Sequence, residues 1–140
     1  MPKSRIDLAI ILDLHSIGVD LFRGSSPSVS TERVFGGQVI GQAMLAACRT
    51  VEGRLPHSLH CYFIHTGDPH VPLIYKVERL RDGKSYSTRC VTATQHESAI
   101  FSMMVSFHKG EEGAFDHQDR MPNVPGPEHF TAEELSSICG

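Results

Sequence analysis

The chain has 140 residues, of which 40% are hydrophobic and 21% charged, and it contains no apolar run long enough to cross a membrane as a helix. Its formal net charge is -3 at pH 7, and its thirteen Lys and Arg residues form no run of four, which excludes the basic footprint typical of nucleic-acid-binding proteins. The apolar run near the N-terminus is too short for a secretion signal, so we expect a soluble protein with no nucleic-acid partner.

Cysteine usage points to a reducing compartment. The four cysteines stand singly, and three of them fall in apolar periodic segments, where a thiol packs as a small hydrophobic group. They are Cys48, Cys61, Cys90 and Cys139. We therefore expect reduced thiols and a cytoplasmic location, or a peroxisomal one if the protein is eukaryotic.

The nine histidines raise the question of a metal site. His57 and His60 lie in a segment with strand periodicity, and residues three apart on a strand point to opposite faces. The two side chains cannot bind one ion together, so we expect no metal. No organic cofactor is expected either.

The N-terminal part of the chain is predicted to be short elements joined by a polar loop. Asp7–Leu12 suits a short amphipathic helix, and residues 14–27 alternate loosely enough to form one strand with an irregularity at Gly18. Ser25–Thr31 is rich in Ser and Pro, which indicates a loop before the next element.

A long helix is predicted from Gly36 or Gly37 to Arg49. After its start its only polar side chains are Gln38, Gln42 and Arg49, and the remaining positions are apolar on nearly every face. A helix of this kind is buried, so we expect the rest of the domain to surround it.

Three segments after the helix alternate with period two, which predicts half-buried antiparallel strands. The residues predicted to face the core are Leu59, Cys61 and Phe63 in the first, Tyr75 and Val77 in the second, and Phe101, Met103, Val105 and Phe107 in the third. Asp82 and Gly83 form a hairpin signal that leads into a Thr-rich fourth strand. One helix and about five strands predict an α+β domain with the sheet wrapped around the helix.

The C-terminal part changes character, because it contains three prolines and little apolar periodicity. Thr131 and Glu134 then form a capping box that starts a helix near the end of the chain. We therefore predict a domain over residues 1–112, followed over 113–140 by a Pro-rich linker and the beginning of a helix that leads to a second domain.

The paired glycines at the start of the long helix allow two interpretations. Gly36 and Gly37 could form a tight entry from loop to helix. Alternatively, unpaired N–H groups at a helix start can stabilise an oxyanion, and glycine leaves room for a ligand atom to approach them. The residues alone do not decide between these interpretations, although no phosphate-loop motif is present.

Five segments, in this order and spacing, resemble the N-terminal half of the acyl-CoA thioesterase II family, which hydrolyses fatty acyl-CoA to free fatty acid and CoA. They are "RVFGGQVIGQAMLAA", "HSLHCYFIHTGDP", "YKVERLRDGKSYSTR", "QHESAIFSMMVSFH" and "FDHQDRMPNVPGPE". The resemblance extends from Leu14 to Glu128. It implies a single hotdog fold, in which an antiparallel sheet wraps a central helix, and it implies acyl-CoA as the substrate.

The resemblance also implies that part of the catalytic site lies elsewhere. Family members are usually about twice this length and contain two hotdogs, and the Asp, Ser or Thr, and Gln that orient the attacking water lie mainly in the second. No position of this chain matches them, and no Asp or Glu occurs between Arg33 and Val51. The isolated chain is therefore expected to be weakly active or inactive.

Six residues are nevertheless candidates for the site in this chain. We predict catalytic roles for Gly37, Gln38 and His57, and substrate binding by Gly36, Gln42 and Arg89. For His57 the alternative is a histidine that is hydrogen-bonded to backbone at a strand start, and for Arg89 the alternative to CoA phosphate binding is a solvated hairpin. No GxSxG motif is present, which argues against an acyl-enzyme serine hydrolase.

Two other functions compete with the thioesterase. A non-catalytic acyl-CoA-binding or dimerisation hotdog would account for the helix without a carboxylate. A hotdog hydratase would require a carboxylate, or a His and Asp pair, near the helix. A hotdog without its covalent partner leaves sheet surface uncovered, so we expect a homodimer, a higher oligomer, or pairing with a second hotdog.

Overall fold

The computed structural model describes residues 8–26 and 33–138. The chain divides into two compact units, Met1–Gly110 and Glu111–Gly140. The first unit contains the sheet and the long helix, and the second contains two short helices. The candidate site lies in the first unit.

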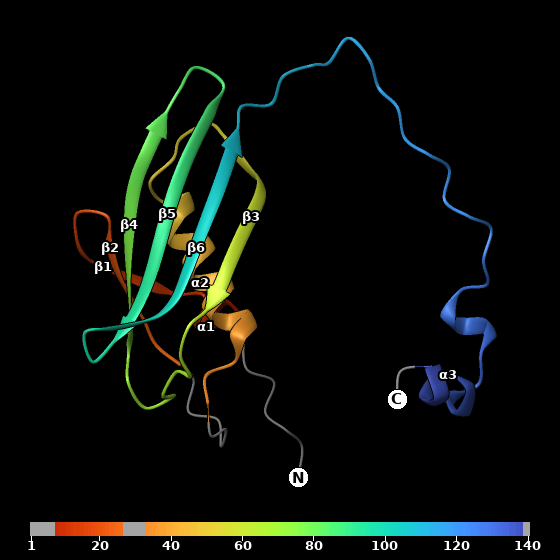
Figure 1. Cartoon of the computed structure of the whole chain (residues 1–140), viewed down its shortest axis with the longest axis horizontal. Helices are drawn as coiled ribbons and strands as arrows, with labels where there is room; N and C mark the ends of the chain where they lie inside the picture. The colour runs from red at the N-terminus through yellow and green to blue at the C-terminus, as the bar shows by residue number, and fades with distance from the viewer. Residues whose placement is uncertain (1–7, 27–32, 139–140) are drawn as a thin grey trace. The chain divides into compact units, whose positions relative to one another are not determined.

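The first unit is an antiparallel sheet of six strands packed against one long helix (Figure 1). The strands are β1 (Leu14–Gly18), β2 (Leu21–Gly24), β3 (Leu55–Phe63), β4 (Leu73–Asp82), β5 (Tyr86–Gln95) and β6 (Ser98–His108), in the sheet order β1-β2-β4-β5-β6-β3. The helices are α1 (Leu8–Ile11) and α2 (Gly36–Cys48). Because α2 contacts every strand, the predicted α+β arrangement of a sheet around a helix is confirmed.

The core lies between α2 and the inner faces of β4, β5 and β6. Ala43, Ala46 and Ala47 of α2 are fully buried, and their small side chains let the helix backbone approach the sheet closely. The predicted inner faces of the second and third segments are confirmed, since Tyr75, Val77, Phe101, Met103, Val105 and Phe107 are all buried. The predicted buried helix is confirmed as well, with bounds within one residue of those expected.

The prediction of one strand over residues 14–27 was wrong. The segment forms a hairpin, in which β1 and β2 pair and Gly18 lies opposite Leu21. Asp20 makes the turn with a φ of 53°, a left-handed conformation that Asp tolerates better than most residues. No Asn-Gly or Asp-Gly pair marks this turn, so residue types alone do not indicate a hairpin there.

The first alternating segment, β3, is more exposed than predicted. It forms one edge of the sheet, and among the described residues it pairs only with β6. Leu59 is 43% exposed and Phe63 is 55% exposed, although both lie opposite buried residues of β6. An edge strand has a neighbour on one side only, which explains why its inward residues are not covered.

The second unit contains η1 (Pro127–His129) and α3 (Ala132–Ile138). The predicted capping box at the start of α3 is confirmed, because the Glu134 N–H donates to Thr131 Oγ1 at 3.3 Å and the Thr131 N–H donates to Glu134 Oε2 at 2.8 Å. Of the helices within the described ranges, none is both long and apolar enough to span a membrane.

Candidate functional site

A cavity of about 470 Å³ opens at the N-terminal start of α2. Its apolar wall is formed by residues of the α2 entry, β3 and β6: Val34, Val39, Phe63, Ile64, Ile100 and Phe101. Polar side chains come from Arg33, His65 and Thr66. Apolar walls with a few polar groups are typical of small-molecule sites.

The start of α2 lies against this cavity, and its first backbone donors have no partner among the described residues. Phe35 is the N-cap residue, and no side chain caps the helix there. The hydrogen bonds of the helix begin with the N–H groups of Gln38 and Val39, which donate to the Phe35 carbonyl at 3.1 and 3.3 Å. The N–H groups of Gly36 and Gly37 come before these bonds and are the orphan donors of the helix start. Gly36 lines the cavity, whereas Gly37 is exposed outside it.

Aromatic rings, rather than open space, lie next to both glycines. A Cβ at Gly36 would lie 3.0 Å from Phe63 Cζ, and a Cβ at Gly37 would lie 2.5 Å from Phe35 Cε1. The structure therefore adds a reason for glycine that the sequence interpretations did not include, which is room for a neighbouring ring. Gly67 is constrained similarly, because a Cβ there would lie 3.1 Å from Val34 Cγ2.

Gln38 and Gln42, predicted to be near the site, hold the segment that follows β2. The Gln38 amide donates to the Ser25 carbonyl at 3.2 Å, and the Gln42 amide donates to the same oxygen at 3.1 Å. Gln42 is fully buried, and its own oxygen accepts a hydrogen bond of 2.7 Å from the Tyr75 hydroxyl, whose pKa is raised by burial. Substrate contact by Gln42 stays a prediction, and its contacts favour a structural role.

Sequence reasoning missed Gln95, which fixes the loop that forms one side of the cavity. Its side-chain oxygen accepts from the Asp68 N–H at 2.8 Å, and its amide donates to the carbonyls of Asp68 at 2.8 Å and Val71 at 2.6 Å. Gln95 is only 5% exposed. The same loop is joined to the α2 entry, since the Val34 N–H donates to the Gly67 carbonyl at 3.0 Å. A lone Gln near a strand end belongs to no motif, so the sequence offered no signal for it.

The alternation of side chains along β3 predicts that His57 shares a face with Leu59 and Phe63, but the structure places it on the other face. The register of β3 shifts between Pro56 and Ser58, at the position of His57. His57 Nε2 lies 2.8 Å from Ser106 Oγ, and its ring contacts those of Tyr86 and His108. Ser106 alternates along β6 with buried residues, so it points away from α2. His57 therefore lies on the sheet face opposite the helix, and a catalytic role for it stays a prediction.

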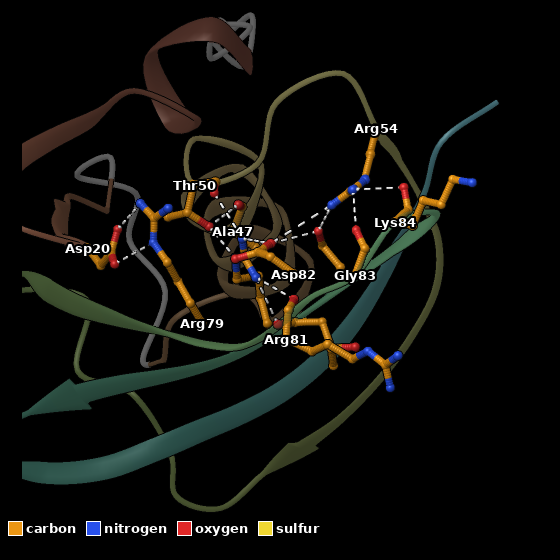
Figure 2. A network of polar contacts seen from close by, with 12 residues as sticks. Asp20, Ala47, Thr50, Arg54, Arg79, Arg81, Asp82, Gly83 and Lys84 are labelled. Carbon is orange, nitrogen blue, oxygen red and sulfur yellow. Dashed lines mark hydrogen bonds and ion pairs between the residues drawn. The ribbon is translucent and has the colours of Figure 1, made fainter.

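Arg89 is not on a solvated hairpin, because it is only 1% exposed. Its hydrogen-bond partners Thr50, Arg81 and Asp82 are labelled in the polar network of Figure 2. Its Nε donates to Thr50 Oγ1 at 2.8 Å, and its Nη2 donates to Asp82 Oδ1 at 2.6 Å. Its Nη1 donates to the Arg81 carbonyl at 3.0 Å. These bonds join the end of α2 to the β4–β5 hairpin. Substrate contact by Arg89 stays a prediction, and its contacts favour this structural role.

The carboxylates near these arginines are held in their charged form. The hydrogen bond from Arg89, and then that from Ser87, lower the pKa of Asp82. Asp20 accepts two hydrogen bonds of 2.8 Å from Arg79, which lower the pKa of Asp20. Arg79 and Arg89 are thus each paired with a carboxylate of this chain.

The sequence from 24 to 108 matches the family described as the acyl-CoA thioesterase N-terminal domain. The chain belongs to this family. The matched segment runs from the end of β2 to the end of β6, so it includes α2 and every residue around the cavity.

The relatives of this thioesterase domain are longer proteins. The chain is 47% identical over 121 residues to acyl-coenzyme A thioesterase 8 of Homo sapiens, covering 86% of this chain and 38% of that protein. It is 45% identical over 130 residues to acyl-CoA thioesterase 2 of Haemophilus influenzae, covering 92% of this chain and 45% of that protein. The chain therefore spans less than half the length of these curated relatives.

Solved structures support the fold. An acyl-CoA thioesterase II of Mycobacterium marinum superposes with a TM-score of 0.79 at 42% identity, covering 93% of this chain and 49% of that one. A hot dog fold protein from Alicyclobacillus acidocaldarius superposes with a TM-score of 0.71 at 21% identity, covering 89% of this chain and 48% of that one. The predicted hotdog fold is confirmed.

The described lining of the cavity offers hydrogen-bond donors but few proton acceptors. The cavity has backbone N–H donors at the helix start and the side chains of Arg33 and His65, but no Asp or Glu among the described residues that line it. Within the described ranges, no group of three His, Cys, Asp or Glu side chains is placed to hold a metal. The cavity can bind and polarise a carbonyl, while a proton acceptor is represented only by His65.

Proposed function

We propose that this chain is the N-terminal half of an acyl-CoA thioesterase, which hydrolyses fatty acyl-CoA to free fatty acid and CoA by direct attack of water. The observation that carries the proposal is the cavity at the start of α2, where an apolar wall lies beside the N–H groups of an uncapped helix. The names of the relatives of this domain support the same substrate class.

In this proposal the acyl chain and the thioester carbonyl of the substrate contact different parts of the cavity. The acyl chain lies along the apolar wall formed by Val39, Ile100 and Phe101, since burial of methylene groups there is favourable by roughly 0.8 kcal/mol each. The thioester carbonyl points toward the helix start, to the N–H group of Gly36, which lines the cavity, and to that of Gly37, which follows just outside it. These donors stabilise the negative charge that forms on the carbonyl oxygen when water attacks the carbon.

The attacking water needs a proton acceptor, and the described lining of this cavity contains no carboxylate that could serve as one. Gln38 is engaged with the Ser25 carbonyl and the Ser26 hydroxyl, and an amide cannot accept a proton at neutral pH. We infer that a second hotdog contributes the carboxylate, and that water is activated where the two hotdogs meet.

A second candidate function is a non-catalytic acyl-CoA-binding or dimerisation module. The lack of a carboxylate in the described cavity lining favours it for the isolated chain. The two proposals differ in one measurable property, because both bind acyl-CoA and only the assembled thioesterase turns it over.

We further propose that this domain assembles through β3. In the described part of the chain this strand ends the sheet, and its inward residue Leu59 is partly exposed. A second hotdog or another copy of the chain would cover this edge. We propose a role in fatty acid metabolism and a cytoplasmic location, with the peroxisome as the alternative, since a yeast relative is named a peroxisomal acyl-coenzyme A thioester hydrolase.

Calorimetric titration with a non-hydrolysable acyl-CoA thioether tests the proposal. We expect the chain to bind the acyl-CoA analogue more tightly than CoA alone, and the Gly37→Val variant to bind it more weakly while its thermal unfolding changes less. Val at this position displaces the Phe35 ring, which is exposed and free to move, and crowds the helix start. Equal affinities of the wild type for CoA and for the analogue would contradict the acyl site.

A further inference from the structure

Phe63 is an exposed aromatic residue in an unusual position. It is the last residue of β3 and is 55% exposed, yet its ring lines the cavity at the start of α2. The ring centroid lies 5.2 Å from that of Phe101, which is fully buried in the cavity wall. One side of Phe63 therefore faces the apolar interior, and the other faces solvent.

The ring also fits against the helix start. The three atoms nearest to a Cβ built at Gly36 all belong to Phe63, at 3.0, 3.2 and 3.7 Å. The absence of a side chain at Gly36 thus leaves space that the ring occupies beside the first N–H groups of α2. Phe63 is positioned where it limits both the size of the cavity and the approach to these donors.

The backbone holds Phe63 on one side only. In the described part of the chain, β3 pairs with β6 alone, and the ladder ends just after Phe63, where the N–H groups of Ile64 and His65 both donate to the Ile100 carbonyl. A ring at the end of an edge strand, with its outer side exposed, can change rotamer without displacing core residues. Phe63 can therefore act as an adjustable wall.

We propose that Phe63 determines the acyl-chain specificity of this site, its ring setting the length of acyl chain that the cavity accepts. This inference rests on the proposed function and adds to it the residue that selects the length of the acyl chain. Removing the ring joins its volume to the cavity, so that further methylene groups of a long chain become buried. A larger ring has the opposite effect.

The test measures affinities for short-, medium- and long-chain acyl-CoA thioethers by calorimetry. We expect Phe63→Ala to raise the ratio of long-chain to short-chain affinity about tenfold, Phe63→Leu to raise it less, and Phe63→Trp to lower it. Tyr62→Ala is the matched control, because Tyr62 is an adjacent exposed aromatic that does not line the cavity. Its ratio should equal that of the wild type.

Three outcomes are distinguishable. A changed ratio in the Phe63 variants alone supports the inference. Normal acyl-CoA binding with an unchanged ratio in both Phe63→Ala and Phe63→Leu overturns the role of Phe63 and leaves the proposed function intact. Wild-type protein that binds no acyl-CoA analogue overturns the proposed function, and the inference with it.

A double-mutant comparison checks the ring contact without any ligand. Ala favours helix more than Gly does, but at Gly36 it meets the Phe63 ring. We expect Gly36→Ala to raise the melting temperature in a Phe63→Leu background and to raise it less, or lower it, in the wild-type background. Equal shifts in both backgrounds would show that the ring does not occupy this space.

Discussion

His57 Nε2 lies 2.8 Å from Ser106 Oγ, and this contact places the histidine on the sheet face that points away from α2. The irregular register of β3 between Pro56 and Ser58 causes this placement, since an inserted residue reverses the alternation of side chains. A strand pattern alone predicts the inner face. His57 therefore lies on the face away from α2, and it is also six residues along β3 from Phe63, the residue of this strand that lines the cavity.

We predict that His57 contributes through its hydrogen bond and ring contacts, and not as a base. His57→Ala should lower the melting temperature, and any loss of turnover in the assembled enzyme should follow this loss of stability. His57→Gln keeps a hydrogen-bonding group for Ser106 but cannot titrate near neutral pH, so it should recover both properties in large part. If His57→Gln stayed folded and were as inactive as His57→Ala, the histidine would have to act as a proton acceptor.

Gln95 should be a strong determinant of the cavity loop. Gln95→Ala removes three part-buried hydrogen bonds to backbone groups and should lower the free energy of unfolding by about 2 to 4 kcal/mol, as measured in urea. Amide hydrogen exchange should increase at Asp68, whose N–H loses its acceptor. Gln118→Ala is a suitable control, because Gln118 is an exposed residue of the second unit.

A second variant, Gln95→Glu, tests which of these hydrogen bonds the side chain donates and which it accepts. The carboxylate can still accept from the Asp68 N–H, but it cannot donate to the carbonyls of Asp68 and Val71 while it is ionised. Protonation restores one donor, so this variant should gain stability relative to wild type as the pH falls through the pKa of the introduced carboxyl. A pH-independent difference between Gln95→Glu and wild type would contradict the assigned contacts.

The pairing of Asp82 with Arg89 predicts the acid limb of the stability curve. The folded-state pKa of Asp82 is lowered from 3.8, so its contribution is present above that value and is lost as the pH falls through the lower folded-state pKa. Asp82→Asn cannot titrate, and should lower stability at pH 7 but show a smaller loss than wild type between about pH 5 and pH 2. Circular dichroism melts across this range measure both. If wild type and Asp82→Asn lost equal stability as the pH fell, protonation of Asp82 would not be linked to unfolding.

The exposed edge strand predicts self-association in the absence of a second hotdog. Sedimentation velocity at micromolar concentration should show a dimer or larger species. Leu59→Lys places a charge at a partly exposed position of β3 and should shift the population toward monomer. Val124→Lys, at an exposed position of the second unit, is the control and should not shift it. A wild-type monomer would count against assembly through β3.

The elements that the sequence predicted well are those whose pattern is local. The apolar surface of α2 and the alternation around Tyr75 and Phe101 depend on burial, which repeats along the chain and can be read from residue types. The capping box at Thr131 is also local, since both its partners lie within four residues. The predicted bounds of α2 and the predicted buried faces of β4 and β6 were therefore correct.

The candidate site was harder to predict because its contacts are long-range. Gln95 reaches Asp68 across 27 positions, and Arg89 reaches Thr50 across 39. The residues adjacent to Gln95 or Arg89 do not distinguish a buried side chain with several hydrogen bonds from an exposed one. The space beside Gly36 is likewise defined by Phe63, a residue on a different element.

The last prediction concerns catalysis by the isolated chain. The described lining of the cavity offers N–H donors but no carboxylate, so the chain should hydrolyse saturated acyl-CoA slowly, whereas a fusion with the second hotdog of the family should turn it over. A missing general base typically costs about a hundred- to ten-thousandfold in rate, which sets the expected difference. Released CoA, trapped with a thiol reagent, measures both rates.

His65 is the candidate proton acceptor for any residual hydrolysis by the isolated chain. It is the one histidine that lines the cavity in the described structure, so His65→Gln should abolish residual hydrolysis by the isolated chain, while His57→Gln should leave it in place. In the fusion, where a carboxylate accepts the proton, His65→Gln should have a much smaller effect. An isolated chain as fast as the fusion would place a sufficient base within these residues, and the idea that catalysis requires a second hotdog would then be wrong.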